Sequence, residues 1–182
     1  TVHVPDKVKT LAARFVPTEK LLAEIAAEEG GPAFTSLRSG FFFQNYAAWA
    51  GAVKAGTVNW PMLHVPAVDP RDMGRVAAAI LAGGDVAVHA GKYYEISGPK
   101  MLTTEEAVGI IAGKLGKEVA YKPVPANGLT FLPPFLQELF AYMEEAGQDA
   151  IPISDDVVKL CGSVTSFEEW LDEGNIAAFK SE

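Results

Sequence analysis

The chain has 182 residues, 49% of them hydrophobic, and carries 15 basic against 23 acidic side chains for a net charge of -8. This length and composition suit one domain with a sizeable core and exclude the disordered and fibrous classes. No run of Lys or Arg forms a stripe that could follow phosphates, so nucleic acid is not expected as a partner. The most apolar stretch, around Phe41 to Val53, is interrupted by Gln44 and Asn45. Because a membrane span needs about 20 apolar residues in a row, we expect a soluble chain.

The distribution of cysteine and histidine argues against metal chemistry. Cys161 is the single cysteine and cannot form an internal disulfide or a metal site alone, which favours a reducing compartment, cytoplasmic or organellar. His3, His64 and His89 are scattered, with no carboxylate at ligand spacing and no serine nucleophile motif. The sequence therefore predicts neither a metal site nor a catalytic triad.

The first elements are a helix and a strand. Thr18 is predicted to cap a helix that runs to about Glu29 and ends at Gly30-Gly31. Its apolar face is formed by Leu21, Leu22, Ile25 and Ala26. A short strand is predicted over Phe34 to Arg38.

The middle of the chain alternates helices with strands. Asp69-Pro70-Arg71-Asp72 predicts the start of a helix that ends at Gly83-Gly84. A strand follows over Lys92 to Ser97. Thr103 and Glu106 have the spacing of a capping box for a helix that reaches Gly116. The segment Glu118 to Lys122 is a further predicted strand.

After Pro123 the pattern becomes helical. Phe135, Leu136, Leu139, Phe140 and Met143 recur at helical spacing. Ser154 is predicted to cap a short helix that ends at Gly162, and Ser166 with Glu169 forms a second capping box. We therefore divide the chain into an α/β part, residues 1–125, and a helical region, residues 126–182, packed on it.

Strands that alternate with helices of ten or more residues indicate α/β units with parallel pairing. Phe34 to Arg38 is expected to lie parallel beside Tyr93 to Ser97, because the intervening helix makes a crossover connection. Two or three strands are too few for a sheet covered on both faces, so we expect its first strands to be missing.

Three motifs, in order, carry a family resemblance. Thr35-Ser36-Leu37-Arg38-Ser39-Gly40-Phe41-Phe42-Phe43-Gln44-Asn45 resembles the T-x-L-R-P-G-F-F-x-x-N stretch of NmrA-like proteins, and follows a Lys20-x-x-x-Glu24 helix. Val68-Asp69-Pro70-Arg71-Asp72-Met73 is similar to the family's V-D-V-R-D-I element. The segment from Tyr93 to Thr103 resembles its Y-x-L-x-G-P-x-x-L-T segment.

The resemblance implies a Rossmann-type domain of the atypical short-chain dehydrogenase/reductase superfamily, with a smaller helical substrate region at the carboxyl end. It also implies that a G-x-x-G-x-x-G strand-loop-helix should precede Thr1, since that loop lets the backbone approach a pyrophosphate. We expect NAD or NADP to bind only together with that half. A protein partner or the missing segment is expected to cover the sheet edge.

The same resemblance suggests site residues, each with a structural alternative. Lys20 aligns with a lysine that holds the nicotinamide ribose, or it is a solvated helix lysine. The tyrosine that precedes this lysine by four residues in catalytic relatives is Val16 here, so the phenol that would donate a proton to a carbonyl being reduced is missing, and the usual reductase chemistry is not expected.

Ser39, Gly40 and Phe41 would supply backbone contacts to the nicotinamide end of a cofactor, or form a turn beside buried aromatic side chains. Phe41, Phe42 and Phe43 could line a substrate pocket or fill the core, and we expect two of the three in the core. Asn45 fits a ligand contact or a helix cap. Two further expectations are structural: a buried ion pair between Arg38 and Asp72, and a packed, unreactive Cys161.

Two functions follow. The first is an NAD(P)-binding redox sensor or atypical reductase without its dinucleotide-binding half. The second is a non-catalytic structural subunit derived from this family and docked in a larger assembly. The substrate and the choice between NAD and NADP are not readable from these residues.

Overall fold

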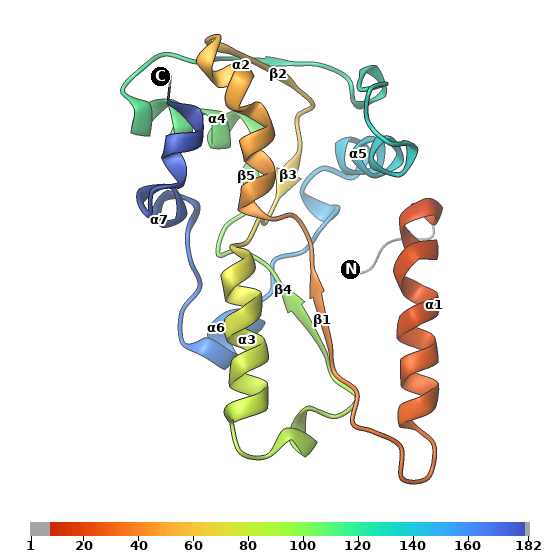
Figure 1. The fold of residues 1–182 in the computed structure, drawn as a ribbon. Coiled ribbons are helices and arrows are strands. Elements are labelled where there is room, and N and C mark those ends of the chain that lie inside the picture. Colours follow the sequence, from red (N-terminus) through yellow and green to blue (C-terminus); the bar gives the residue numbers. More distant parts are fainter. Residues whose placement is uncertain (1–7, 181–182) are drawn as a thin grey trace.

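Helices surround three small two-stranded sheets (Figure 1). This structure is a computed structural model that describes residues 8–180, so His3 lies outside the described residues. The α-helices are α1 (Lys9–Ala26), α2 (Ala50–Lys54), α3 (Pro70–Ala82), α4 (Thr104–Leu115), α5 (Pro134–Ala146), α6 (Asp156–Cys161) and α7 (Phe167–Asp172). The strands are β1 (Ser36–Ser39), β2 (Thr57–Trp60), β3 (His64–Val65), β4 (Tyr93–Ile96), β5 (Leu102–Thr103) and β6 (Ala120–Pro123). Short 3-10 helices are η1 (Phe43–Trp49), η2 (Val86–His89), η3 (Ala126–Gly128), η4 (Gly147–Asp149) and η5 (Asn175–Phe179).

Two of the three strand pairs are parallel. β1 lies parallel to β4, with Ser36 opposite Tyr93 and Ser39 opposite Ile96, which confirms the expected pairing. The predicted strand before Pro123 is β6, and it pairs in parallel with β2, which was not predicted. β3 and β5 form a short antiparallel pair that was also not predicted. The fold is thus mixed α/β with parallel strands, while the expected additional strands stay a prediction.

The two edges of the β1–β4 pair differ. On β4, the backbone N–H of Glu95 donates to the Asp156 carboxylate at 2.8 Å, and the N–H of Ser154 donates to the Ser97 hydroxyl at 2.8 Å. The outer edge of β4 is therefore closed by the segment that leads into α6. β1 pairs only with β4, so within residues 8–180 its other edge has no neighbouring strand.

Three of the five predicted caps start helices as expected, while those at α6 and α1 do not. The Asp69 carboxylate accepts from the N–H of Arg71 at 2.9 Å at the start of α3, and both capping boxes form, at α4 and at α7. At α6 the cap residue is Asp155. The Ser154 hydroxyl accepts from the N–H of Asp156 at 3.1 Å, so the predicted cap is displaced by one residue.

The first helix is longer than predicted. α1 begins at Lys9 and continues through Pro17, so Thr18 lies inside the helix and does not cap it. An interior proline removes one backbone hydrogen bond and usually costs about 3 kcal/mol. The residues before it, Leu11, Ala12 and Ala13 among them, are good helix formers and carry the helix past that defect. The C-terminal end also comes earlier than expected, at Ala26.

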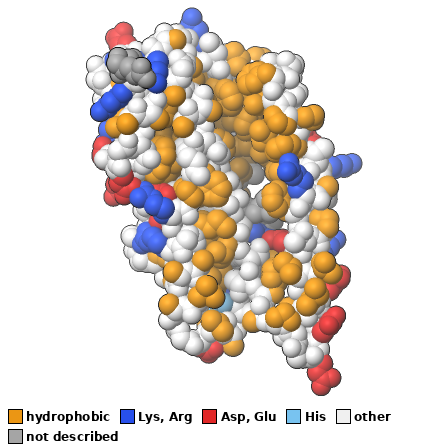
Figure 2. All heavy atoms as spheres, in the orientation of Figure 1, with side chains coloured by type: hydrophobic (Ala, Val, Ile, Leu, Met, Phe, Trp, Pro, Cys, Tyr) orange, Lys and Arg blue, Asp and Glu red, His pale blue; other side chains and the backbone are white. Residues whose placement is uncertain are grey.

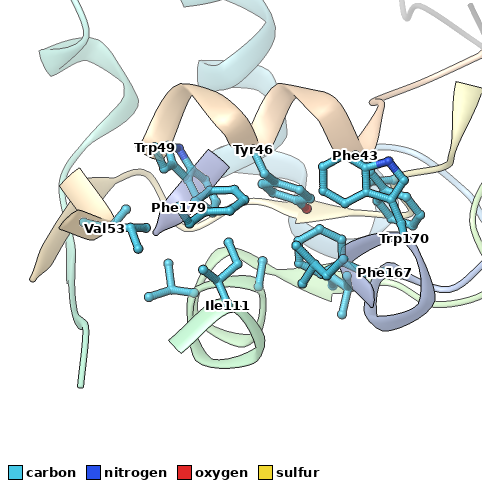
Figure 3. Packing of buried hydrophobic residues seen from close by; sticks show 14 residues of the cluster. Phe43, Tyr46, Trp49, Val53, Ile111, Phe167, Trp170 and Phe179 are labelled. Carbon is cyan, nitrogen blue, oxygen red and sulfur yellow. The ribbon is translucent and has the colours of Figure 1, made fainter. Parts of the chain in front are cut away.

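The largest hydrophobic cluster joins η1 to the C-terminal helices. Figure 3 shows Phe43 and Tyr46 of η1 beside Phe167 of α7, while Trp49, at the other end of η1, lies beside Phe179 of η5. The Tyr46 and Phe167 ring centroids are 4.9 Å apart, and the Phe43 and Phe167 centroids are 5.1 Å apart. Such aromatic contacts fix η1 against α4 and α7, and so fix the direction in which the chain leaves β1.

Each of the three hydrophobic clusters contains residues from both sides of position 125. α7 packs with η1 and α4, α5 packs with β3, and α6 packs with α3. The division into an α/β part, residues 1–125, and a helical region, residues 126–182, stays a prediction. In packing terms, the second part fills the cores of the first.

Substitution of Gly98 would test how tightly the turn after β4 is packed. A methyl group at Gly98 would lie 1.9 Å from the carbonyl oxygen of Ala67, whereas one at Gly109 in α4 would meet nothing within 4 Å. We expect Gly98→Ala to lower the free energy of unfolding by about 2 kcal/mol or more, because backbone must move. Gly109→Ala should raise it by up to about 1 kcal/mol, since alanine favours helix. Urea denaturation compares the two, and equal effects would contradict the packing at Gly98.

Candidate functional site

A cavity of about 960 Å³ lies between α1, the end of β1 and α5. α1 contributes Leu11, Phe15, Thr18 and Glu19 to its wall, at the spacing of one helical face. The contribution of α5 is apolar apart from Tyr142: Leu136, Leu139, Phe140, Tyr142 and Met143. Hydrophobic side chains cover much of the face that α5 and α1 share in Figure 2. The cavity is therefore of a size and polarity typical of small-molecule sites.

Five of the six predicted cofactor-contact residues line this cavity: Ser39, Gly40, Phe41, Phe42 and Asn45. They follow one another because β1 ends at Ser39 and the chain turns into η1 directly after Phe42. The sixth, Lys20, is exposed on α1 and is not among the lining residues. The structure thus brings the predicted loop to a cavity, while a cofactor role for any of the six stays a prediction.

The three consecutive phenylalanines divide between core and wall. Phe43 is buried in the η1 cluster, with 1% of its surface exposed. Phe41 and Phe42 are half-buried: each packs against a core cluster and also lines the cavity. Asn45 lies within the first turn of η1, whose cap position is Phe42, so the cap reading of Asn45 is wrong.

Gly40 leaves room at the cavity wall. A methyl group built there would meet the Ile151 side chain at 3.5 Å, an ordinary van der Waals contact. The backbone conformation at Gly40 is not left-handed, so an alanine could be accommodated without strain. The backbone at Gly40 therefore does not require glycine, whereas a side chain there would take up space at the cavity wall.

The charged group at the cavity is Glu19. Its carboxylate accepts from Arg38 Nε at 3.0 Å and Arg38 Nη2 at 2.8 Å, and from the Ser36 hydroxyl at 2.5 Å. Arg38 is also 3.6 Å from a Glu95 carboxylate oxygen, and its guanidinium lies 4.1 Å above the Tyr93 ring. The bond from Arg38 lowers the pKa of Glu19, so the carboxylate is ionised at neutral pH.

The partner predicted for Arg38 was wrong. Asp72 is buried at the start of α3 and binds Arg75 at 2.6 Å and the backbone N–H of Thr165 at 2.8 Å. Arg38, on β1, instead pairs with Glu19 and Glu95. The reason is topological: Glu95 lies opposite Arg38 in the β1–β4 register, and α1 brings Glu19 over the same strand.

α1 is attached to the rest of the chain mainly by polar contacts, since none of its side chains is buried. Near its start, the backbone N–H of Lys9 donates to Glu138 of α5 at 2.8 Å, and the Arg14 guanidinium lies 4.6 Å above the Phe135 ring. Further along, Glu19 binds β1. Toward the C-terminal end of the helix, beyond the residues that line the cavity, Leu21, Leu22 and Ile25 are exposed.

Other candidate groups do not form a second site. Among residues 8–180 no group of three or more His, Cys, Asp or Glu side chains could hold a metal ion. His89 Nδ1 is 2.7 Å from the Tyr94 hydroxyl, a link between η2 and β4. Cys161 is half-buried and packs against the α3 cluster, as expected for a packed thiol. The same part of the chain contains no helix with the length and hydropathy of a membrane span.

Sequence reasoning missed Glu19, Ser36 and the contribution of α5 to the wall. The helix pattern of α5 predicted an apolar face, yet nothing in the pattern indicated what that face would meet. For Glu19 a usable signal existed: it lies four residues after Phe15 and eight after Leu11, on the same face of a helix. That signal was hidden because the helix was expected to begin at Thr18.

The Glu19–Arg38 pair should make stability depend on pH. The pKa of Glu19 is lowered in the fold, so its contribution is present above the ordinary value of 4.5 and is lost as pH falls below that value. For a pair of about 1 kcal/mol, we expect Glu19→Gln to lower Tm by about 2–4 °C at pH 7 and by much less at pH 3. Thermal melts followed by circular dichroism measure both. An equal loss at the two pH values would contradict the ion pair.

Comparisons with known proteins place this geometry in a family. The first relative is a (4-alkanoyl-5-oxo-2,5-dihydrofuran-3-yl)methyl phosphate reductase from Streptomyces griseus, 26% identical over 185 residues, which cover 94% of this chain and 62% of the relative. Quinone oxidoreductase 2 of Escherichia coli is 27% identical over 129 residues, 66% of this chain and 41% of that protein.

A solved structure shares the fold. The NADPH-dependent quinone oxidoreductase of Escherichia coli, complexed with NADPH, superposes with a TM-score of 0.73 at 23% identity, over 91% of this chain and 60% of that one. The chain thus spans about three fifths of the length of the first relative and of this structure. A model of the NmrA-like family matches residues 14–171. Since that match covers most of the sequence, the chain belongs to the NmrA-like family.

Proposed function

We propose that this chain forms the substrate side of an NAD(P)H-dependent reductase, and that the cavity between α1, β1 and α5 holds the molecule to be reduced. The observation that carries the proposal is the coincidence of the Ser39–Asn45 loop with a largely apolar cavity of about 960 Å³. Two of the relatives are named as a reductase and a quinone oxidoreductase, which supports the reaction class. A redox sensor would use the same residues without turnover.

The residues present fit one end of a dinucleotide. Ser39 to Phe42 line the cavity, and the missing side chain of Gly40 would allow a flat nicotinamide ring to approach the backbone there. The other end needs a glycine-rich loop at a helix start. Gly30-Gly31 and Gly83-Gly84 follow helix ends and do not supply it. When bound, the dinucleotide would supply the hydride.

The chain's own residues would orient the acceptor. The α5 side chains and Phe41 exclude water from its apolar body, while Asn45 and Ser39 offer hydrogen bonds at the opposite wall. Val16 occupies the α1 position that holds tyrosine in catalytic relatives, so α1 supplies no phenol as proton donor. An acceptor that takes its proton from water suits such a site better than an alcohol–ketone pair.

A structural subunit remains the second function considered, and the relatives described above give it no support. The observation that favours some covering partner is the exposed apolar face of α1 together with the free edge of β1. Unpaired strand edges and contiguous apolar surface are usually covered in soluble proteins. We therefore propose that another protein segment, of this or a partner chain, packs on this side.

The covering segment gives a testable consequence for residues 1–182 produced alone. We expect them to self-associate, or to melt without cooperativity, because α1 and β1 lack a neighbour. Size-exclusion chromatography with thermal melting measures both. A monodisperse monomer with a cooperative melt near 60 °C, typical of mesophile domains, would show that no such neighbour is needed.

The reductase proposal is tested with the full-length product of the gene. We expect it to oxidise NADPH or NADH in the presence of a quinone or azo acceptor, followed by absorbance at 340 nm. Gly40→Ala should raise the KM for the dinucleotide about threefold or more, because a methyl group fills space at the wall. Gly74→Ala, in α3 with nothing within 4 Å, is the matched control.

Residues 1–182 alone are expected to show no micromolar binding of NAD or NADP by calorimetry, since they supply no pyrophosphate loop. Two results would contradict the proposal: tight dinucleotide binding by residues 1–182 alone, or no dinucleotide binding by the full-length product.

A further inference from the structure

The cavity is unusual in its charge. Among its lining residues, all within the described part of the chain, there is no Lys, Arg or His, and Glu19 carries the single charge. Arg38 binds Glu19 but is not itself a lining residue. A ligand that enters therefore meets a carboxylate and not a guanidinium.

Each nitrogen of the Arg38 guanidinium already lies near a carboxylate oxygen. Its Nε and Nη2 groups donate to the two oxygens of Glu19, its Nη1 group is directed to Glu95, and its flat face lies on the Tyr93 ring. Arg38 and Glu19 are about one-fifth exposed, so water screens this cluster only in part. Glu19, Arg38 and Glu95 together carry one net negative charge.

We propose that Glu19 determines substrate specificity, by neutralising Arg38 and so making the cavity select uncharged, apolar ligands against anionic ones of the same shape. This inference rests on the proposed function and narrows its substrate class: acceptors that carry a carboxylate at the cavity wall are disfavoured. The physical basis is twofold. An anion at the wall is repelled by the Glu19 carboxylate, and it finds no free guanidinium with which to pair.

The proposal predicts what single substitutions do to charge selection. Glu19→Gln keeps the size of the side chain and removes the net charge of the cluster, which also frees Arg38 donors for a ligand. A unit charge about 7 Å away, at an effective dielectric constant near 20 and with some screening, changes affinity on the order of tenfold. Arg38→Gln should weaken the binding of anionic ligands further, because it leaves the carboxylates of Glu19 and Glu95 without the cation that they share.

The test measures binding by calorimetry to the full-length protein, with 2-naphthalenemethanol and 2-naphthoate as a neutral and an anionic probe of similar shape. We expect the parent protein to bind the alcohol about tenfold more tightly than the carboxylate. Glu19→Gln should reduce this ratio to about threefold or less by improving binding of the carboxylate, and Arg38→Gln should increase it. Glu24→Gln, which removes an exposed charge from the same helix outside the cavity, should leave the ratio unchanged.

Several results would overturn the proposal: equal binding of the two probes by the parent protein, binding of neither probe, or a ratio that Glu19→Gln leaves unchanged. An equal effect of Glu24→Gln would assign the selection to overall charge, which also refutes a role specific to Glu19. Binding needs no turnover, so the reductase proposal can fail while the charge selection stands, and the reverse outcome is equally visible.

Discussion

The Glu19–Arg38 ion pair is the interaction on which the candidate site depends. α1 buries none of its side chains, so the hydrophobic effect holds it only weakly against the rest of the chain. Two polar contacts keep α1 over the cavity: Glu19 of α1 binds Arg38 of β1, and Glu138 of α5 accepts from the backbone N–H of Lys9. Without these contacts the cavity would lose one wall, and its volume would become open surface. A carboxylate thus helps to shape a site whose other lining residues are uncharged.

The wall formed by the Ser39–Asn45 segment is held by aromatic packing of η1 in the core, whereas α1 has no buried side chain. Phe43, Tyr46 and Trp49 fix η1 in the largest cluster, and the residues just before η1 are those that line the cavity. Their position is therefore set by side chains that point the other way, into the core. The site combines a wall fixed by burial with a wall fixed by charge. Ligand-dependent movement should accordingly be found in α1 before it is found in η1.

Local signals predicted most of the helices and the parallel pair, because caps and periodicity act over a few residues. Asp69, Thr103 and Ser166 each satisfy nearby backbone N–H groups, and the structure confirms all three. α1 was misplaced because Pro17 and Thr18 resemble a helix start, while good helix formers before them extend the helix back to Lys9. β2 was missed although Thr57-Val58-Asn59-Trp60 has strand composition.

The candidate site was predicted only as far as the motif reaches. The Ser39–Asn45 segment was named from its resemblance, and five of the six residues do share a cavity. The partners of Arg38 could not be read in the same way, since Glu19, Arg38 and Glu95 are far apart in sequence and meet only through the β1–β4 register and the placement of α1. Pairing of long-range charges is a property of topology, and no local pattern encodes it.

The same topology explains why an ion pair lies beside a largely apolar cavity. Arg38 belongs to the strand that leads into the loop, and an unpaired guanidinium beside the cavity would attract any anion. Glu95 lies 3.6 Å from one guanidinium nitrogen and does not line the cavity. Glu19 binds the other two nitrogens and is a lining residue. The Glu19 carboxylate therefore both attaches α1 to β1 and neutralises the charge of Arg38 beside the cavity. A substitution that separates the two effects would replace Glu19 with a neutral side chain that still binds Ser36 and Arg38.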